Sequence, residues 1–258
     1  MARRRNSNRR RRRGGARFLY KLVSMLVICG AIVAALTLFF RVDTVVVTGL
    51  SRYTAQEVQD AAGIRDGDNL LLFNKYDMAP RIVSALPYIE EVRINRKLPD
   101  TLLIEVRECR RPFALVQGGS AWLISPRGRG KIVDQVDAEE APAYPQISGC
   151  ELLSPSVGTQ IAMATEFSTR QESLLSLLSA LEEADMLDQV DGVRLDDAAC
   201  IRMDYAGRFT VKMLYGADYA RKLRALSLYL ADEKIQDNMT GTFDLTRDDK
   251  NYFRQEVR

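Results

Sequence analysis

One apolar run constrains this chain more than any other feature. Residues 22–40 read LVSMLVICGAIVAALTLFF and carry no charged side chain. As an α-helix this run would rise roughly 28 Å, close to the ~30 Å hydrocarbon core of a bilayer. The sequence therefore predicts a transmembrane helix at 22–40, preceded by a short tail at 1–21 and followed by a much longer folded part.

The tail has a charge pattern that sets the expected topology. Residues 1–21 carry ten basic side chains and no acidic one, whereas the rest of the chain has 27 basic and 34 acidic residues. Arginine clusters can bind nucleic acid, but basic residues directly before a membrane span are typical of the cytoplasmic side. We therefore predict a cytoplasmic N-terminus, contact between the tail and anionic lipid, no nucleic-acid partner, and a folded part outside the cytoplasm.

A cleaved signal peptide would have a similar charge layout, but two features argue against it. The apolar run is longer than the 7–15 residues of a usual signal core, and it ends in Phe39-Phe40-Arg41 without an A-x-A site. A lipoprotein signal at Cys29 fits poorly, because Ile28 precedes the cysteine. We expect an uncleaved anchor, on which a face of small residues could pack against another membrane helix: Gly30, Ala31, Ala34 and Ala35.

The chemistry that the chain lacks is as informative as the chemistry it has. It contains no histidine and four widely spaced cysteines, of which three lie beyond the apolar run. This pattern is not a disulfide framework, so buried free thiols are expected. There is no P-loop, no G-x-S-x-G and no S-x-x-K, and adjacent acids such as Asp196-Asp197 are typical of solvated turns. We predict a protein that is not an enzyme and has no metal site or cofactor.

The segment 41–110 has an order of elements that can be read from local signals. A β-branched strand at 42–47 precedes a capping box formed by Thr54 and Glu57, which opens a short helix expected to bury Ala55 and to stop at Gly63. Asp77 is expected to cap a second helix that ends before residue 87. Two alternating strands, joined by the turn at 97–100, complete a β-α-α-β-β module.

This order resembles a POTRA domain, and the motifs resemble those of the FtsQ/DivIB family. The motifs are Val45-x-Val47-x-Gly49, Gly67-x-Asn69-Leu70, Leu86-Pro87, Pro99-Asp100-Thr101-Leu102, and Ile104-x-Val106-x-Glu108 ahead of Arg110-Arg111-Pro112. Cys109 departs from the family pattern, which has a basic residue directly after the glutamate. The resemblance implies a cell-division protein whose POTRA domain follows a membrane anchor.

The segment 111–258 is expected to form a second, β-rich module, which makes the whole chain α+β. Residues 134–145 are acidic and proline-rich and are interpreted as a surface loop. A capping box at Ser168 and Gln171 would open a leucine-striped helix, and Asp218 would cap another. Strands are expected at 190–195, 201–205, 209–214, 241–245 and 251–257, with a hairpin turn at Ala206-Gly207. The segment 144–149 resembles the family's Leu-Pro-x-Ile-x-Gly.

Binding is the function that remains. Open strand edges accept partner strands by β-augmentation, and the C-terminal strand is the natural candidate. The residues expected to contact a partner there are Phe243, Asp244, Leu245, Tyr252 and Phe253. The resemblance implies the partners: FtsB/DivIC-like and FtsL-like bitopic division proteins and, through them, FtsW with its septal transpeptidase. It also implies a location at the division septum and a role in supporting septal peptidoglycan synthesis.

Two alternative functions differ in what they require. A POTRA module of a protein-transport or wall-assembly system would need a β-barrel or repeated POTRA units, and the chain shows neither pattern. An enzyme of wall metabolism would cleave or cross-link peptidoglycan, and this activity would contradict the scaffold hypothesis.

Overall fold

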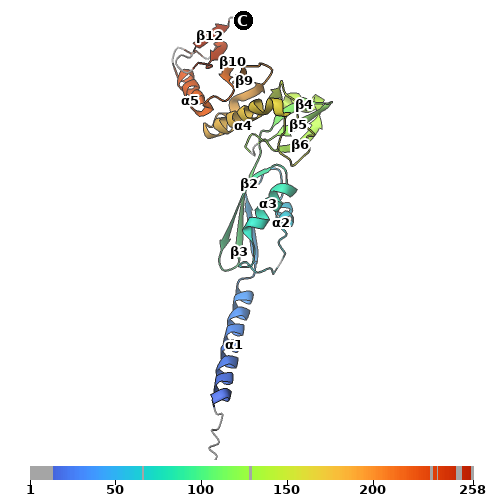
Figure 1. Cartoon of the computed structure of the whole chain (residues 1–258), viewed down its shortest axis with the longest axis vertical. Helices are drawn as coiled ribbons and strands as arrows, with labels where there is room; N and C mark the ends of the chain where they lie inside the picture. The colour runs from blue at the N-terminus through green and yellow to red at the C-terminus, as the bar shows by residue number, and fades with distance from the viewer. Residues whose placement is uncertain are drawn as a thin grey trace, which may run out of the picture.

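The structure is a computed structural model that describes residues 14–65, 67–127, 130–232, 235–236, 238–247 and 252–256. The described chain is elongated, with a helix at one end, a small module in the middle and a larger module at the far end (Figure 1). The arginine-rich tail at residues 1–13, and with it the predicted lipid contact, lies outside the described residues.

The helix α1 runs from Gly14 to Phe39. Its segment Phe18–Phe39 is, among the described residues, the one helix long and apolar enough to cross a membrane. The most apolar window of this segment is fully exposed. Its length and composition therefore match the predicted span, although the helix begins before residue 22.

The first module has the predicted β-α-α-β-β order. Its elements are β1 (Thr44–Thr48), α2 (Ala55–Ala62), α3 (Lys75–Ala85), β2 (Ile89–Lys97) and β3 (Thr101–Glu108). The sheet order is β1-β3-β2, with β1 parallel and β2 antiparallel to β3. Alternate residues of β3 join both helices in one core, whose central side chains are Val58, Leu70, Met78, Ile82, Leu102 and Ile104.

Local signals predicted one helix start correctly and one wrongly. The capping box of α2 is present: Glu57 N–H donates to the Thr54 hydroxyl, and Thr54 N–H donates to the Glu57 carboxylate at 2.7 Å. The prediction that Ala55 is buried was wrong, since its side chain is exposed. Asp77 does not cap α3 either. Asn74 does, by accepting from Tyr76 N–H, and Asp77 lies in the first turn.

The second module is one nine-stranded sheet with two main helices. The strand order is β12-β11-β10-β9-β8-β7-β4-β5-β6. The strands are β4 (Phe113–Gln117), β5 (Ser120–Ile124), β6 (Ile132–Asp137), β7 (Gln146–Ser148), β8 (Val190–Arg194), β9 (Cys200–Tyr205), β10 (Phe209–Leu214), β11 (Thr240–Asp244) and β12 (Tyr252–Glu256). The helices are α4 (Ser168–Glu183) and α5 (Tyr219–Leu230), with short 3₁₀ turns at Ala138–Ala143, Thr165–Phe167 and Leu187–Gln189.

The core of this module lies between the sheet and the two helices. From α4 it receives Leu174, Leu177, Leu178 and Leu181, and from α5 Tyr219, Leu223 and Leu226. The strands contribute every second residue, such as Ile201 and Met203 of β9 and Val211 of β10. The residues between them, such as Arg202 and Lys212, leave the opposite face of the sheet polar.

Turns and helix starts in this module agree with the sequence-based predictions at some positions and differ at others. The turn at Ala206-Gly207 is confirmed, since both residues have positive φ, and Asp218 caps α5 by accepting from Arg221 N–H. The surface loop at 134–145 was wrong, because β6 and a 3₁₀ turn occupy it. The capping box at Ser168 was also wrong: Gln171 instead accepts from Met163 N–H and fastens the preceding segment. The α+β fold as a whole is confirmed.

Candidate functional site: an open sheet edge

The strand β12 is the outermost strand of the nine-stranded sheet. It pairs antiparallel with β11 alone, in a register that places Phe253 opposite Phe243 and Tyr252 opposite Asp244. Alternate N–H and C=O groups of an antiparallel strand point away from its neighbour. Within the described part of the chain no strand takes up these outward groups, so β12 presents an open edge at the end of the molecule far from α1 (Figure 1).

The five predicted contact residues divide into three that pack toward the core and two that lie on the polar face of the edge. Phe243 and Leu245 are fully buried, which corrects the expectation that their side chains face a partner. Phe253 is half-buried, with its ring 4.7 Å from the Phe243 ring, and both rings pack edge-on against Phe209. These aromatic rings hold β11 and β12 on the core, because inward-pointing side chains alternate along both strands.

The other two predicted residues lie on the polar side. Tyr252 is 48% exposed. Asp244 accepts from Thr246 Oγ1 at 2.6 Å and from Thr246 N–H at 3.0 Å. The Thr246 hydroxyl is the main cause that lowers the pKa of Asp244, so this carboxylate is charged at neutral pH. The exposed face of the edge therefore offers one aromatic side chain beside one fixed negative charge.

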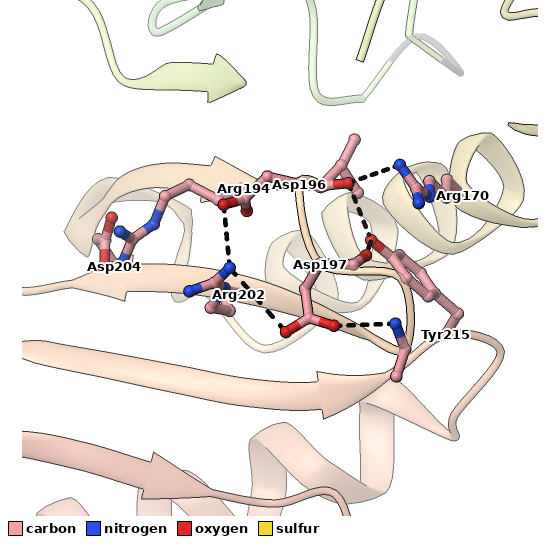
Figure 2. A network of polar contacts seen from close by, with 9 residues as sticks. Arg170, Arg194, Asp196, Asp197, Arg202, Asp204 and Tyr215 are labelled. Atoms are coloured by element: carbon pink, nitrogen blue, oxygen red, sulfur yellow. Dashed lines mark hydrogen bonds and ion pairs between the residues drawn. The ribbon is translucent and has the colours of Figure 1, made fainter. Parts of the chain in front are cut away.

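The polar face continues along β8 and β9 as a network of ion pairs (Figure 2). Arg194 contacts Asp204 at 2.6 Å, and Arg202 contacts Asp196 at 2.9 Å and Asp197 at 3.9 Å. The adjacent acids Asp196 and Asp197 therefore both contact Arg202 of β9, and Asp197 also binds the backbone of its own turn. Their geometry is that of a structural turn and does not set up a pair of acids facing a substrate.

The same turn is fixed to α4 and to the end of β10. Arg170 donates to the Leu195 carbonyl at 2.9 Å, and the Tyr215 hydroxyl donates to the Asp197 carbonyl at 2.9 Å (Figure 2). The N–H of Ala199 donates to the Asp197 carboxylate at 2.9 Å and is the main cause that lowers its pKa. These bonds hold the turn between β8 and β9 rigid.

A second group of polar contacts lies where the two modules meet. Lys131 donates to the Val83 carbonyl at 2.6 Å, near the C-terminus of α3. The Tyr88 hydroxyl donates to Asp134 of β6 at 2.9 Å, and Arg52 pairs with Asp134 at 3.4 Å. Apolar side chains from both modules pack beside these bonds: Tyr88, Cys109, Ala114, Ala121, Leu123, Val133 and Ala141. The two modules therefore share a packed junction.

Glu108 lies at the end of β3, beside this junction, and its carboxylate binds the backbone of residues 51–53. It accepts from Ser51 N–H at 2.9 Å, Ser51 Oγ at 2.6 Å, Arg52 N–H at 2.7 Å and Tyr53 N–H at 3.1 Å. Burial alone would raise the pKa of Glu108, but these four bonds outweigh it and the pKa is lowered. Sequence reasoning quoted Glu108 in a family motif without assigning it a role.

A cleft of about 460 Å³ opens along the junction. Its lining includes Glu90, Arg107, Arg111, Arg127, Glu182 and Asp188. Most of these charges are partnered, because Arg127 contacts Glu182 at 3.2 Å and Arg107 reaches the same carboxylate at 3.8 Å. Buried Glu90 accepts from the Ser125 hydroxyl, and burial raises the pKa of Glu90. The ion pair between Arg107 and Glu182 thus connects β3 to α4 across the cleft.

The cysteines of the described residues are structural thiols, and neither they nor the acids form a metal site there. All four cysteines are free, with Cys109 and Cys200 buried and Cys150 half-buried, as expected for structural thiols. Burial raises the pKa of Cys109 to about 12 and that of Cys150 to about 11, so neither is a thiolate at neutral pH. In the described ranges no group of three His, Cys, Asp or Glu residues is placed to hold a metal ion.

The fold and the open edge define a protein in which a POTRA-type module stands between an apolar helix and a β-rich sheet. A family profile described as "POTRA domain, FtsQ-type" matches residues 40–108. The chain is 26% identical over 217 residues to a "Cell division protein FtsQ" of Geotalea daltonii, covering 83% of this chain and 75% of that protein. The chain therefore has a POTRA domain of the FtsQ type and is similar to a cell-division protein over most of its length.

Two other relatives extend the comparison. A "Cell division protein FtsQ" of Anaeromyxobacter is 29% identical, with 55% of this chain and 50% of that protein covered. A "Cell division protein DivIB" of Clostridium botulinum is 31% identical, with 42% and 43% covered. These two matches span half or less of the relatives' own length. Together with the domain match they show that the chain carries an FtsQ-type POTRA domain and is similar to FtsQ and DivIB cell-division proteins.

Proposed function

We propose that this protein is a single-pass scaffold of the bacterial division machinery and that β12 is the strand on which a partner docks. The open edge of β12 is the observation that carries the proposal. A partner strand added there would satisfy the outward backbone groups and extend the sheet. Phe243 and Phe253 contribute by keeping the edge rigid on its core, while Tyr252 and the backbone make the contact.

Similarity to FtsQ and DivIB proteins indicates the kind of partner. FtsQ and DivIB proteins are division proteins by name, so the docked strand is proposed to come from another protein of the division complex. We propose FtsB/DivIC-like and FtsL-like bitopic proteins as direct partners. FtsW and the septal transpeptidase would be reached through them, which would couple the scaffold to septal peptidoglycan synthesis.

The placement in the membrane is part of the same proposal. The apolar segment Phe18–Phe39 would span the bilayer, with the arginine-rich tail in the cytoplasm and both modules outside it, at the septum. The modules would divide at residues 110 and 111. The side chains of Ala31, Ala34 and Ala35 and the surface at Gly30 are exposed on α1, where a partner's membrane helix could approach closely.

A photo-crosslinking experiment tests the docking strand. A photoreactive phenylalanine analogue replaces Tyr252 on β12 or, as a control, Leu228, which is 71% exposed on α5. Full-length chain is mixed in detergent with the FtsB/DivIC-like protein of the same organism. We expect crosslinks from position 252 and none from position 228. Equal crosslinking from both positions, or crosslinking from neither in a mixture that still co-purifies, would contradict docking on β12.

A truncation sharpens this test. Ending the chain at residue 250 removes β12 but leaves β11 in place, whereas ending it at residue 238 would also strip Phe243 and Leu245 from the core. The shorter deletion should abolish co-purification with the partner while circular dichroism keeps the helix signal. Retained co-purification would show that the partner binds elsewhere.

A further inference from the structure

Four apolar side chains lie exposed on the end of the POTRA domain that faces α1. They are Leu71 and Leu72 in the loop before α3, Tyr76 at the start of α3, and Leu98 in the turn between β2 and β3, exposed by 41%, 80%, 77% and 61%. We call them the helix-proximal patch. Figure 1 shows this end of the first module directly beyond the last turn of α1. The patch is separate from the β12 edge, which lies at the opposite end of the molecule.

Hydrogen bonds fix the loop that carries Leu71 and Leu72 to the end of α1. The side-chain amide of Asn69 donates to the carbonyls of Leu36 and Thr37, each at 3.3 Å. Leu70 N–H donates to the Phe40 carbonyl at 2.7 Å. Carbonyls in the last turn of a helix have few backbone donors left to them, and the Leu36 carbonyl also accepts from Phe40 N–H at 3.2 Å. Asn69 therefore adds a side-chain cap to the end of α1 from outside the helix. This cap holds the loop at the level of the helix's final turn.

The turn that carries Leu98 is held in the same region from the other side. Asp43 N–H donates to the Asp100 carbonyl at 3.0 Å, and Val42 N–H donates to the Asp68 carbonyl at 2.8 Å. Both donors belong to the few residues that connect α1 to β1. The loop and the turn therefore flank the point where the chain leaves α1, and neither can move far from it without losing these bonds.

The apolar character of the patch is not explained by the core of the domain. Leu70, Met78 and Ile82 fill that core from the same segment and are fully buried, while Leu72 and Tyr76 point outward. Removing a leucine side chain from water is favourable, so several apolar side chains left exposed together mark a contact surface. Tyrosine beside leucine is typical of the boundary between lipid headgroups and acyl chains. The exposed charges in the same segments are of both signs, Arg41 and Lys75 beside Asp43 and Asp77, as expected at a polar headgroup level.

We propose that the helix-proximal patch inserts into the headgroup boundary of the bilayer that α1 spans. The inference rests on the proposed transmembrane placement of α1, because that placement brings Leu36, Thr37 and the loop capped onto them to the membrane surface. The bilayer covers Leu71, Leu72, Tyr76 and Leu98. The contact holds the POTRA domain against the membrane and thereby limits its rotation about the short connection at residues 40–43.

Tryptophan quenching by brominated lipid tests the contact directly. The chain contains a single tryptophan, Trp122, so Trp122→Phe gives a silent background. Leu72→Trp places the probe in the patch, and Leu228→Trp places it at a comparably exposed leucine on α5. Both full-length variants are reconstituted into vesicles of phosphatidylethanolamine and phosphatidylglycerol. We expect a blue-shifted emission at position 72 that brominated lipid quenches, and no quenching at position 228.

The outcomes separate this inference from the proposed function. A probe at position 72 that is no more quenched than the probe at 228, in a chain that floats with the vesicles, would overturn the lipid contact and leave the anchor intact. A chain that does not float would overturn the anchor and the lipid contact together. Emission that shifts only when division proteins are added would assign the patch to a protein partner and overturn the proposal. Tyr76→Trp repeats the test if Leu72→Trp fails to fold.

Discussion

The ammonium group of Lys131 donates a hydrogen bond to the backbone carbonyl of Val83 at 2.6 Å, which ties the second module to the end of α3 in the first. The same group lies 3.4 Å from the Ile89 carbonyl, and its side chain is buried. A cation near a helix C-terminus is favourable because the helix dipole is negative there. The relative placement of the POTRA domain and the nine-stranded sheet therefore depends on a contact between them.

Replacing Lys131 with methionine should loosen this junction. Methionine keeps most of the volume but leaves the Val83 carbonyl without its donor, which costs about 1–3 kcal/mol for a buried group. The apparent free energy of unfolding of the full chain, measured by denaturant titration in detergent, should fall by that amount. Lys97→Met, at an exposed lysine of β2, is the control and should be close to neutral. Equal effects of the two substitutions would contradict the role of Lys131.

Replacing Glu108 with glutamine should destabilise the first module in a pH-dependent way. The lowered pKa of Glu108 means that the folded state favours the charged carboxylate. Its contribution is therefore present above the ordinary carboxyl pKa of 4.5 and is lost as the pH falls through the lower folded-state value. At neutral pH we expect a loss of about 1–3 kcal/mol in the free energy of unfolding.

The difference between the parent chain and Glu108→Gln should shrink as the pH falls below 4.5. Glu105→Gln is the matched control, because Glu105 is an exposed glutamate of the same strand. Its effect should be small at every pH. A Glu108→Gln loss that stays constant down to acidic pH would show that the carboxylate charge is not the cause.

Alanine substitutions of Phe243 and Tyr252 should have different effects: the first on the stability of the fold, the second on partner binding. Phe243→Ala removes a fully buried ring and should lower the free energy of unfolding by about 3–5 kcal/mol. Tyr252→Ala should change stability by less than about 1 kcal/mol, as is usual for exposed side chains, but should weaken partner capture. Thermal unfolding and co-purification, measured on both variants, separate the two roles. A large loss of stability in Tyr252→Ala would show that it also supports the sheet.

Gly49 is required by the close approach of two backbones. It has φ of +88°, and a Cβ there would lie 1.9 Å from the Val106 carbonyl oxygen of β3. Gly67 has φ of +84° but no atom within 4 Å of such a Cβ. Both Gly→Ala substitutions incur backbone strain of about 1–3 kcal/mol, and only Gly49→Ala adds a clash. The unfolding midpoint should therefore fall further for Gly49→Ala, and equal midpoints would contradict the clash.

Local patterns predicted much of the first module because they act over a few residues. The capping box of Thr54 and Glu57 and the alternation along β3 need no distant contact, and both are present. Asp77 was misplaced as a cap because Asn74, three residues earlier, has a side chain that serves equally well. The acidic, proline-rich segment 134–145 was interpreted as a loop, although pairing with β5 makes residues 134–137 part of the strand β6.

The candidate site was only partly predictable. Sequence reasoning chose the C-terminal edge, and β12 does lie at the edge of the sheet. It could not tell which side chains of β11 face the core, because that depends on the register of β11 against β10 and β12. This register places Phe243 and Phe253 on the inward face and Asp244 and Tyr252 on the outward face. Lys131 carried no sequence signal at all, since its partners are backbone carbonyls far away in the chain.

Length, periodicity and short motifs are local properties, so the amino-acid sequence was enough to predict the apolar helix, the β-α-α-β-β order and the resemblance to FtsQ and DivIB proteins. Three features became visible in the folded chain alone: the open edge of β12, the burial of Phe243 in the core, and the hold of Asn69 on Leu71 and Leu72 at the end of α1. These features depend on pairings and packing between segments far apart in the chain. No short window of sequence contains both partners of such a contact.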